Sequence, residues 1–172
     1  DGTAEVAGNL YQGVAPLTGH TNRLVTTVAA AGATQIVATI TTTVAATDIY
    51  AEGMVHVNDA VGEAYAYRIR RALTAGAAHA SAASTATLTV NLEPGETVQV
   101  ALDTTSEVTF TRNRYHQVTI HVSPPTALLS GVSPGIAAAD RFYWSQVKGY
   151  AAVLANLTLL AGLPVQPDIA VN

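Results

Sequence analysis

Residues 131–135 (GVSPG) match G-x-S-x-G, the turn that presents the nucleophilic serine of α/β-hydrolases. In that turn, the backbone N–H of the residue after the serine helps to stabilise the oxyanion. Here that residue is Pro134, which has no N–H, and a proline-containing loop precedes the motif where the hydrolase fold needs a strand. We therefore predict a structural turn around Ser133, assign no catalytic residue and expect no enzymatic activity.

The five histidines are the next candidates for chemistry, as ligands of a metal ion. His116 and His121 are five residues apart, so on one strand they point to opposite faces and cannot share a metal. His20, His56 and His79 are expected on an arm, a strand and a loop, and no H-x-H or H-x-x-x-H spacing occurs. We predict surface or cross-strand hydrogen-bonding histidines, and we assign no metal and no cofactor.

Oxygen ligands gather at one expected turn, where Asn58, Asp59 and Glu63 lie close together in the sequence. Such oxygens can hold Ca²⁺, but the EF-hand pattern is absent and Asn-Asp is ordinary turn composition. A hairpin turn is the favoured interpretation, and calcium binding is the alternative.

Five of the seven arginines fall in two short stretches: Arg68, Arg70, Arg71, Arg112 and Arg114. If their strands are neighbours, they form a positive patch on an acidic protein. Arginine suits paired interfaces, so one interpretation is docking to acidic groups of a partner. The alternative, of equal weight, is pairing with Asp or Glu on a neighbouring strand.

Phe142, Tyr143 and Trp144 are adjacent, so on a strand they must face both sides. One side belongs to the core, and the other is a candidate partner or ligand surface. We include Tyr143 and Trp144 with the five arginines as candidate interface residues. A carbohydrate-binding platform of aromatic rings stays open as an alternative.

Composition limits the classes of function that these residues can serve. The 172-residue chain has net charge −4, which leaves no electrostatic footprint for DNA or RNA. No apolar run is long enough to span a membrane. Cysteine is absent, which fits a reducing cytoplasm or a particle assembled inside one. Charged residues make up only 12%, and Lys148 is the one lysine, so we expect a surface that neighbouring molecules cover.

The elements that position these residues are expected to be short strands. Residues 23–29 and 35–42 are β-branched runs joined by a turn, and residues 53–58 and 63–70 form a hairpin with Tyr65, Tyr67 and Ile69 on one face. Further strands are expected at residues 87–92, 98–102, 108–111, 115–122 and 141–148, with a last hairpin over 150–161 and a loop over 73–84.

This pattern predicts an all-β fold, a single antiparallel β-sandwich or jelly-roll-like barrel. We expect an extended N-terminal arm at residues 1–20, the β-sandwich domain at 21–163 and an extended tail at 164–172.

Two stretches resemble a known family. Residues 49–53 (IYAEG), 57–59 (VND), 62–63 (GE) and 67–69 (YRI) look like a hairpin common in small structural proteins of tailed bacteriophages. Residues 141–149 (RFYWSQVKG), 151–154 (AAVL) and 162–165 (GLPV) are similar to the C-terminal part of the same proteins. Together the two stretches cover roughly a third of the chain, with Asn156 and Leu157 replacing the acidic or asparagine-glycine turn that is frequent there.

The resemblance implies capsid decoration, the role of a β-rich cement protein that coats an expanded head. Its implied partner is the major capsid protein, and its implied place is the capsid exterior of a virion assembled in the bacterial cytoplasm. We expect a homo-oligomer, with a trimer at the shell three-fold axes favoured. A phage tail or fibre protein, or a carbohydrate-binding β-sandwich module, is the alternative.

Overall fold

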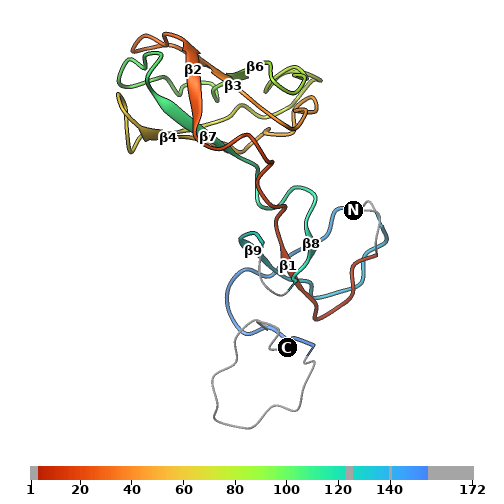
Figure 1. Cartoon of the computed structure of the whole chain (residues 1–172). Coiled ribbons are helices and arrows are strands. Elements are labelled where there is room, and N and C mark those ends of the chain that lie inside the picture. The colour runs from red at the N-terminus through yellow and green to blue at the C-terminus, as the bar shows by residue number, and fades with distance from the viewer. Residues whose placement is uncertain (1–3, 123–125, 140, 155–172) are drawn as a thin grey trace, which may run out of the picture. The chain divides into compact units, whose positions relative to one another are not determined.

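A computed structural model of the chain describes residues 4–122, 126–139 and 141–154, which contain no helix (Figure 1). The described strands form two antiparallel sheets, so the predicted all-β fold is confirmed. The strands are β1 (Leu10–Gln12), β2 (Arg23–Thr27), β3 (Gln35–Thr39), β4 (Met54–Asp59), β5 (Ala66–Arg68), β6 (Thr87–Asn91), β7 (Glu107–Thr111), β8 (Thr119–Ile120) and β9 (Leu129–Val132).

The chain divides into two compact units, which corrects the expected single domain over residues 21–163. The barrel unit is Pro16–Asn113, and the terminal unit combines Asp1–Ala15 with Arg114–Asn172. Residues 1–20 are not simply an arm, because β1 lies between β8 and β9 as the central strand of a sheet. Glycine and proline around β1 suggested an arm, whereas its pairing partners lie more than a hundred residues away and leave no local signal. The predicted tail at 164–172 lies outside the described residues.

The barrel unit contains a six-stranded sheet in the order β5-β4-β7-β2-β3-β6. Its two edge strands meet, because Ile69 and Leu92 form an antiparallel bridge directly after β5 and β6. Two backbone hydrogen bonds flank this bridge, from Arg70 N to the Asn91 carbonyl (2.8 Å) and from Glu93 N to the Arg68 carbonyl (3.0 Å). The sheet therefore curls until its two edges meet at this bridge, where backbone groups of both edges are paired.

Alternation along the strands fills the interior of the barrel unit. Every second residue is buried in β4, β6 and β7, as the burial patterns of these strands show. The largest apolar side chains of this core are Tyr50, Tyr67, Phe110, Ile36, Ile40, Ile69, Leu88 and Leu102. The uncharged outer positions of β2, β3 and β6 are mostly threonine, so these strands carry the predicted β-branched pattern on both faces.

The hairpin predicted for residues 53–70 is confirmed as β4 and β5, with Val55 opposite Tyr67 and Met54 opposite Arg68. Tyr67 and Ile69 point into the core, and the side chain of Arg68 is exposed. Tyr65 is partly exposed and stacks on Tyr67, with the ring planes 8° from parallel. The strand predicted at residues 98–102 is reduced to a bridge between Leu102 and Ala29.

The terminal unit has the sheet order β8-β1-β9, with Tyr11 and Gln12 of β1 buried. β9 falls in a segment that was expected to be a loop, and the strand predicted at 115–122 shortens to β8. Residues 141–148 do not form the expected strand; they pair with β9 only at Gln146, opposite Val132. Of the predicted hairpin over 150–161, residues 150–154 are not in a strand and the remainder lies outside the described residues.

Candidate docking surface

Three aromatic side chains of the terminal unit are almost fully exposed. They belong to Phe142, Trp144 and Tyr150, which fall within residues 142–150 and which we call the aromatic strip for their closeness in sequence; the exposed fraction of Trp144 is 89%. Trp144 was a candidate interface residue and is exposed, whereas Phe142, which was not among the candidates, is exposed as well. Tyr150 was missed, because its segment was assigned to a hairpin rather than to this surface.

Tyr143, between the two exposed rings, has the opposite role. Its ring packs against that of Tyr11 with centroids 5.6 Å apart. Burial, followed by the nearby Glu5 carboxylate, raises the pKa of the Tyr143 phenol to about 12. Of the two candidate aromatic residues, Tyr143 is thus half-buried against Tyr11, and Trp144 is exposed.

Gln146 anchors the aromatic strip to the sheet. Its backbone N–H donates to the Val132 carbonyl (2.8 Å), and Val132 N–H donates to the Gln146 carbonyl (3.0 Å). The side-chain amide of Gln146 donates to the carbonyls of Tyr150 (2.6 Å) and Lys148 (3.3 Å), across a turn in which Gly149 has φ +91°. These bonds close the turn between Trp144 and Tyr150.

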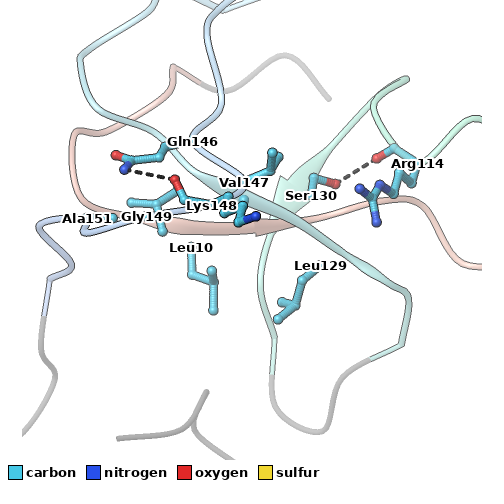
Figure 2. A pocket seen from close by; sticks show the side chains of 11 residues that line it. Leu10, Arg114, Leu129, Ser130, Gln146, Val147, Lys148, Gly149 and Ala151 are labelled. Atoms are coloured by element: carbon cyan, nitrogen blue, oxygen red, sulfur yellow. Dashed lines mark hydrogen bonds between the residues drawn. The ribbon is translucent and has the colours of Figure 1, made fainter.

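A cleft of about 270 Å³ lies beside this turn, within the terminal unit (Figure 2). Leu10, Leu129 and Val132 supply apolar surface, and Arg114 and Lys148 supply two positive charges. The Arg114 guanidinium lies over the Tyr115 ring, 4.7 Å from its centroid. The side chains lining the cleft include no carboxylate, so the cleft is complementary to an acidic group with apolar neighbours.

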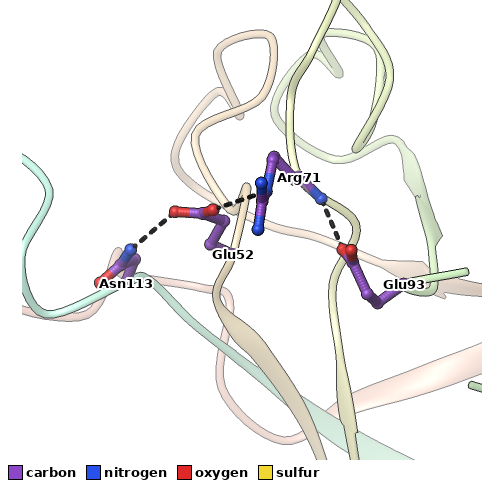
Figure 3. A network of polar contacts seen from close by, with 4 residues as sticks. All are labelled: Glu52, Arg71, Glu93 and Asn113. Atoms are coloured by element: carbon purple, nitrogen blue, oxygen red, sulfur yellow. Dashed lines mark hydrogen bonds and ion pairs between the residues drawn. The ribbon is translucent and has the colours of Figure 1, made fainter.

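The three arginines after β4 lie on the outside of the barrel unit. Arg68 and Arg70 are exposed, and Arg71 pairs with Glu52 at 3.1 Å. Figure 3 shows this network: Glu52 also accepts from the Asn113 amide (3.3 Å), and Arg71 N–H donates to the Glu93 carboxylate (2.9 Å). Of the two interpretations of the arginines, Arg71 therefore follows the second, pairing with an acidic residue of the same chain.

The other two candidate arginines are in different surroundings. Arg112 follows β7 and is half-buried, and burial lowers the pKa of its guanidinium even though the nearby Tyr50 favours the charged form. Arg114 belongs to the terminal unit and lines the cleft there. Within the barrel unit, Arg68 and Arg70 are thus exposed, whereas Arg112 is half-buried and close enough to Tyr50 to interact with it electrostatically.

Two of the five histidines do not follow the prediction. His20 and His79 are fully buried in the barrel unit, although they were expected on an arm and a loop. His56 makes the expected cross-strand hydrogen bond, to the Thr111 hydroxyl (3.1 Å), and His121 bonds the side-chain oxygen of Gln12 (2.9 Å). Among the described residues, no group of three or more histidines, aspartates and glutamates is arranged to hold a metal ion.

The turn predicted around Ser133 is confirmed. Its side chain is buried, and its hydroxyl donates to the Gly135 carbonyl at 2.6 Å. At the other candidate turn, the Asp59 carboxylate accepts from Ala60 N–H (2.7 Å) and the Asn58 amide donates to Asn22 (3.0 Å). These polar groups are thus occupied with structural hydrogen bonds.

Comparison with protein-family models, with curated proteins and with solved structures finds no significant match. Within the part of the chain that is described, no helix has the length and hydrophobicity needed to cross a membrane.

Proposed function

We propose that this chain is a non-enzymatic virion protein that decorates and stabilises an assembled bacteriophage capsid by bridging neighbouring shell subunits. The observation that carries the proposal is the aromatic strip, because Phe142, Trp144 and Tyr150 are each almost entirely exposed to solvent. An aromatic side chain buries about 150–250 Å² when it is covered, so three exposed aromatic side chains in one short segment offer a partner a large apolar area. The major capsid protein is the proposed partner.

The low charge of the barrel unit supports the same proposal. The outward residues of β2, β3 and β6 include Leu24, Thr26, Thr39, Thr87 and Thr89, all uncharged and at least partly exposed. A freely diffusing monomer ordinarily carries a higher proportion of charge on its surface. A protein covered by its neighbours on a shell has less need of charge for solubility.

The proposed mechanism is mechanical. Aromatic anchors lose their water on docking and supply most of the energy at each site. Arg114 and Lys148 would meet an acidic group of the shell subunit at the cleft. Many weak sites on one rigid particle then add up through multivalency. Because only the assembled shell offers these sites, binding shifts the equilibrium toward the intact particle by mass action.

Two further parts of the proposal follow from a shell location. The chain would form a homo-oligomer, most simply a trimer on the shell three-fold axes, because a closed oligomer matches the symmetry of its site. It would be assembled in the bacterial cytoplasm and remain on the capsid exterior.

The test is co-sedimentation of the purified chain with capsids of its source phage that lack it. The double variant Phe142→Ala/Trp144→Ala should lose at least about tenfold in affinity, the effect of removing one strong anchor residue. Ile136→Ala, which truncates an exposed apolar side chain outside the aromatic strip, is the matched control and should bind normally. Unchanged binding by the double variant would contradict the proposal.

The exposed rings also favour a second candidate, a tail, fibre or carbohydrate-binding module. Sugar rings stack on exposed aromatic platforms, and Trp144 offers one. In that case Trp144→Ala would abolish binding to host-surface glycans while leaving incorporation of the chain into particles unchanged.

A further inference from the structure

His20, Tyr50 and His79 are enclosed together inside the barrel unit, apart from the surfaces described above. Their side chains are 0–1% exposed. The Tyr50 ring lies between the two imidazoles, with its centroid 5.8 Å from that of His20 and 5.6 Å from that of His79. The Phe110 ring packs against that of Tyr50, with the two centroids 5.5 Å apart.

The hydrogen bonds of His20 define its tautomer. Its Nε2 atom is 2.8 Å from the Thr43 carbonyl oxygen, which can only accept, so Nε2 carries the proton. Burial lowers the pKa of His20 and so favours the neutral ring, in which the Nδ1 atom accepts the hydrogen bond of the Tyr50 hydroxyl at 2.6 Å. Both nitrogens of the ring are then hydrogen-bonded.

His79 is neutral in the opposite tautomer. Its Nδ1 atom lies 2.8 Å from the Ala80 carbonyl and must donate to it. Its Nε2 atom accepts the backbone N–H of Tyr50 at 3.1 Å. Tyr50 thus donates to both imidazoles, through its hydroxyl to His20 and through its N–H to His79.

The charged groups around the cluster have opposite effects on the two histidines. Arg112 and Arg23 face His20, and both disfavour a second positive charge there. Asp48 favours a proton on His79, but its carboxylate also accepts backbone N–H bonds from Gly76 (2.6 Å), Ala78 (2.9 Å) and His79 (3.2 Å). Burial is the largest influence on both histidines and lowers the pKa of each.

The cluster ties together three segments that lie outside the strands. His20 precedes β2, Thr43 and Tyr50 belong to the connection between β3 and β4, and His79 belongs to the connection between β5 and β6. A proton added to His79 places an N–H against the Tyr50 N–H, which cannot turn away. A proton added to His20 only reverses its bond with the Tyr50 hydroxyl, which can turn and accept, so His79 is the imidazole whose protonation breaks a contact of the cluster.

We propose that His20, Tyr50 and His79 form an acid-sensitive latch, which holds the two connections against the barrel while His79 is neutral and releases them when His79 is protonated. This inference is independent of the proposed function. In the open state both rings reach water and regain an ordinary pKa near 6.5. Acid therefore favours opening, because the open state binds more protons than the closed state.

The pH dependence of latch opening follows from the difference in pKa between the closed and open states. Above about pH 6.5 both forms are neutral, and the latch is fully stable. As the pH falls below that value, the equilibrium constant for opening rises by up to about tenfold per pH unit for each histidine. The effect reaches its limit where the closed form itself becomes protonated.

Hydrogen exchange on the full chain tests the latch directly. The amides of Tyr50, Gly76 and Ala78 should lose at least about tenfold in protection between about pH 7 and pH 5, after correction for the intrinsic rate. The amide of Val90 in β6 should retain its protection. Equal loss at Val90, or no loss at Tyr50, would overturn the proposal.

Variants and spectroscopy complete the test. His79→Gln keeps a donor and an acceptor without titrating, so its Tyr50 amide should lose less protection with acid than in the wild type. The control is His56→Gln. The partner of His56 is the Thr111 hydroxyl, which can accept or donate, so protonation of His56 breaks no hydrogen bond. The acid-induced loss of protection at the Tyr50 amide should therefore be the same in His56→Gln as in the wild type. If His79→Gln does not fold, the imidazole nitrogen NMR signals of the wild type at about pH 6 decide. Neutral rings in opposite tautomers at His20 and His79 support the latch. Protonated rings in the folded chain overturn it.

Discussion

Ile69 and Leu92 pair across the line at which the first and last strands of the six-stranded sheet meet. Both side chains are buried, and two backbone hydrogen bonds flank the pair. The residues are 23 positions apart and follow strands β5 and β6. This contact joins the two edges of the sheet, so the core of the barrel unit depends on it.

Truncating this pair should destabilise the barrel unit. Ile69→Ala removes a fully buried side chain, which ordinarily lowers the free energy of unfolding by about 2–5 kcal/mol. Leu73→Ala, in an exposed loop of the same unit, should change it by less than about 0.5 kcal/mol. Urea unfolding followed by circular dichroism measures both. Equal effects of the two variants would mean that the edges do not close in this way.

Substitutions of two glycines should distinguish the cost of backbone strain from the cost of a steric clash. Gly19 and Gly32 both have positive φ, at +81° and +88°. A Cβ on Gly19 would lie 2.0 Å from the Thr41 carbonyl oxygen, whereas nothing lies within 4 Å of one on Gly32. Gly32→Ala should therefore cost about 1–2 kcal/mol, and Gly19→Ala about 1–3 kcal/mol more.

The same unfolding measurement compares the two glycine variants. An insoluble Gly19→Ala beside a folded Gly32→Ala agrees with the prediction. Equal stability of the two variants would show that residues 19 and 41 are not in contact.

Alkaline pH should loosen the terminal unit through Tyr143. Its pKa is raised from 10.0 to about 12 by burial, so the folded chain holds the phenol proton that the unfolded chain releases. Stability from this group is present below pH 10 and is lost as the pH rises toward 12. Tyr143→Phe should show a smaller loss of stability over that window. A loss identical to that of the wild type would contradict the assignment.

Local patterns in the sequence were sufficient to predict much of the barrel unit. The alternation at residues 87–91 and 107–111 and the turn chemistry between β4 and β5 depend on neighbouring residues, and these elements were predicted correctly. β1 and β9 were missed because each is short, and β1 pairs with β8 across more than a hundred residues. Non-local pairing of this kind leaves no periodic signal.

The candidate surface was predicted in part for a similar reason. Adjacent aromatic residues at 142–144 predicted that neighbouring side chains point alternately toward the core and toward solvent. Tyr143 packs against Tyr11 and Trp144 is exposed, in agreement with that prediction. The arginines were grouped by their spacing alone, and spacing does not show that Arg71 meets Glu52 or that Arg112 is half-buried. His20 and His79 were missed because Tyr50, the partner that they share, is about 30 residues from each.

The number of copies of this chain in purified virus particles of its source tests the proposed function most directly. Quantitative mass spectrometry of the particles gives that number relative to the shell protein. A decoration protein that bridges shell subunits should be present within a few-fold of the shell protein, since it occupies equivalent sites over the whole capsid. A handful of copies per particle would place it in the tail or fibre, and its absence from the particle would contradict the account.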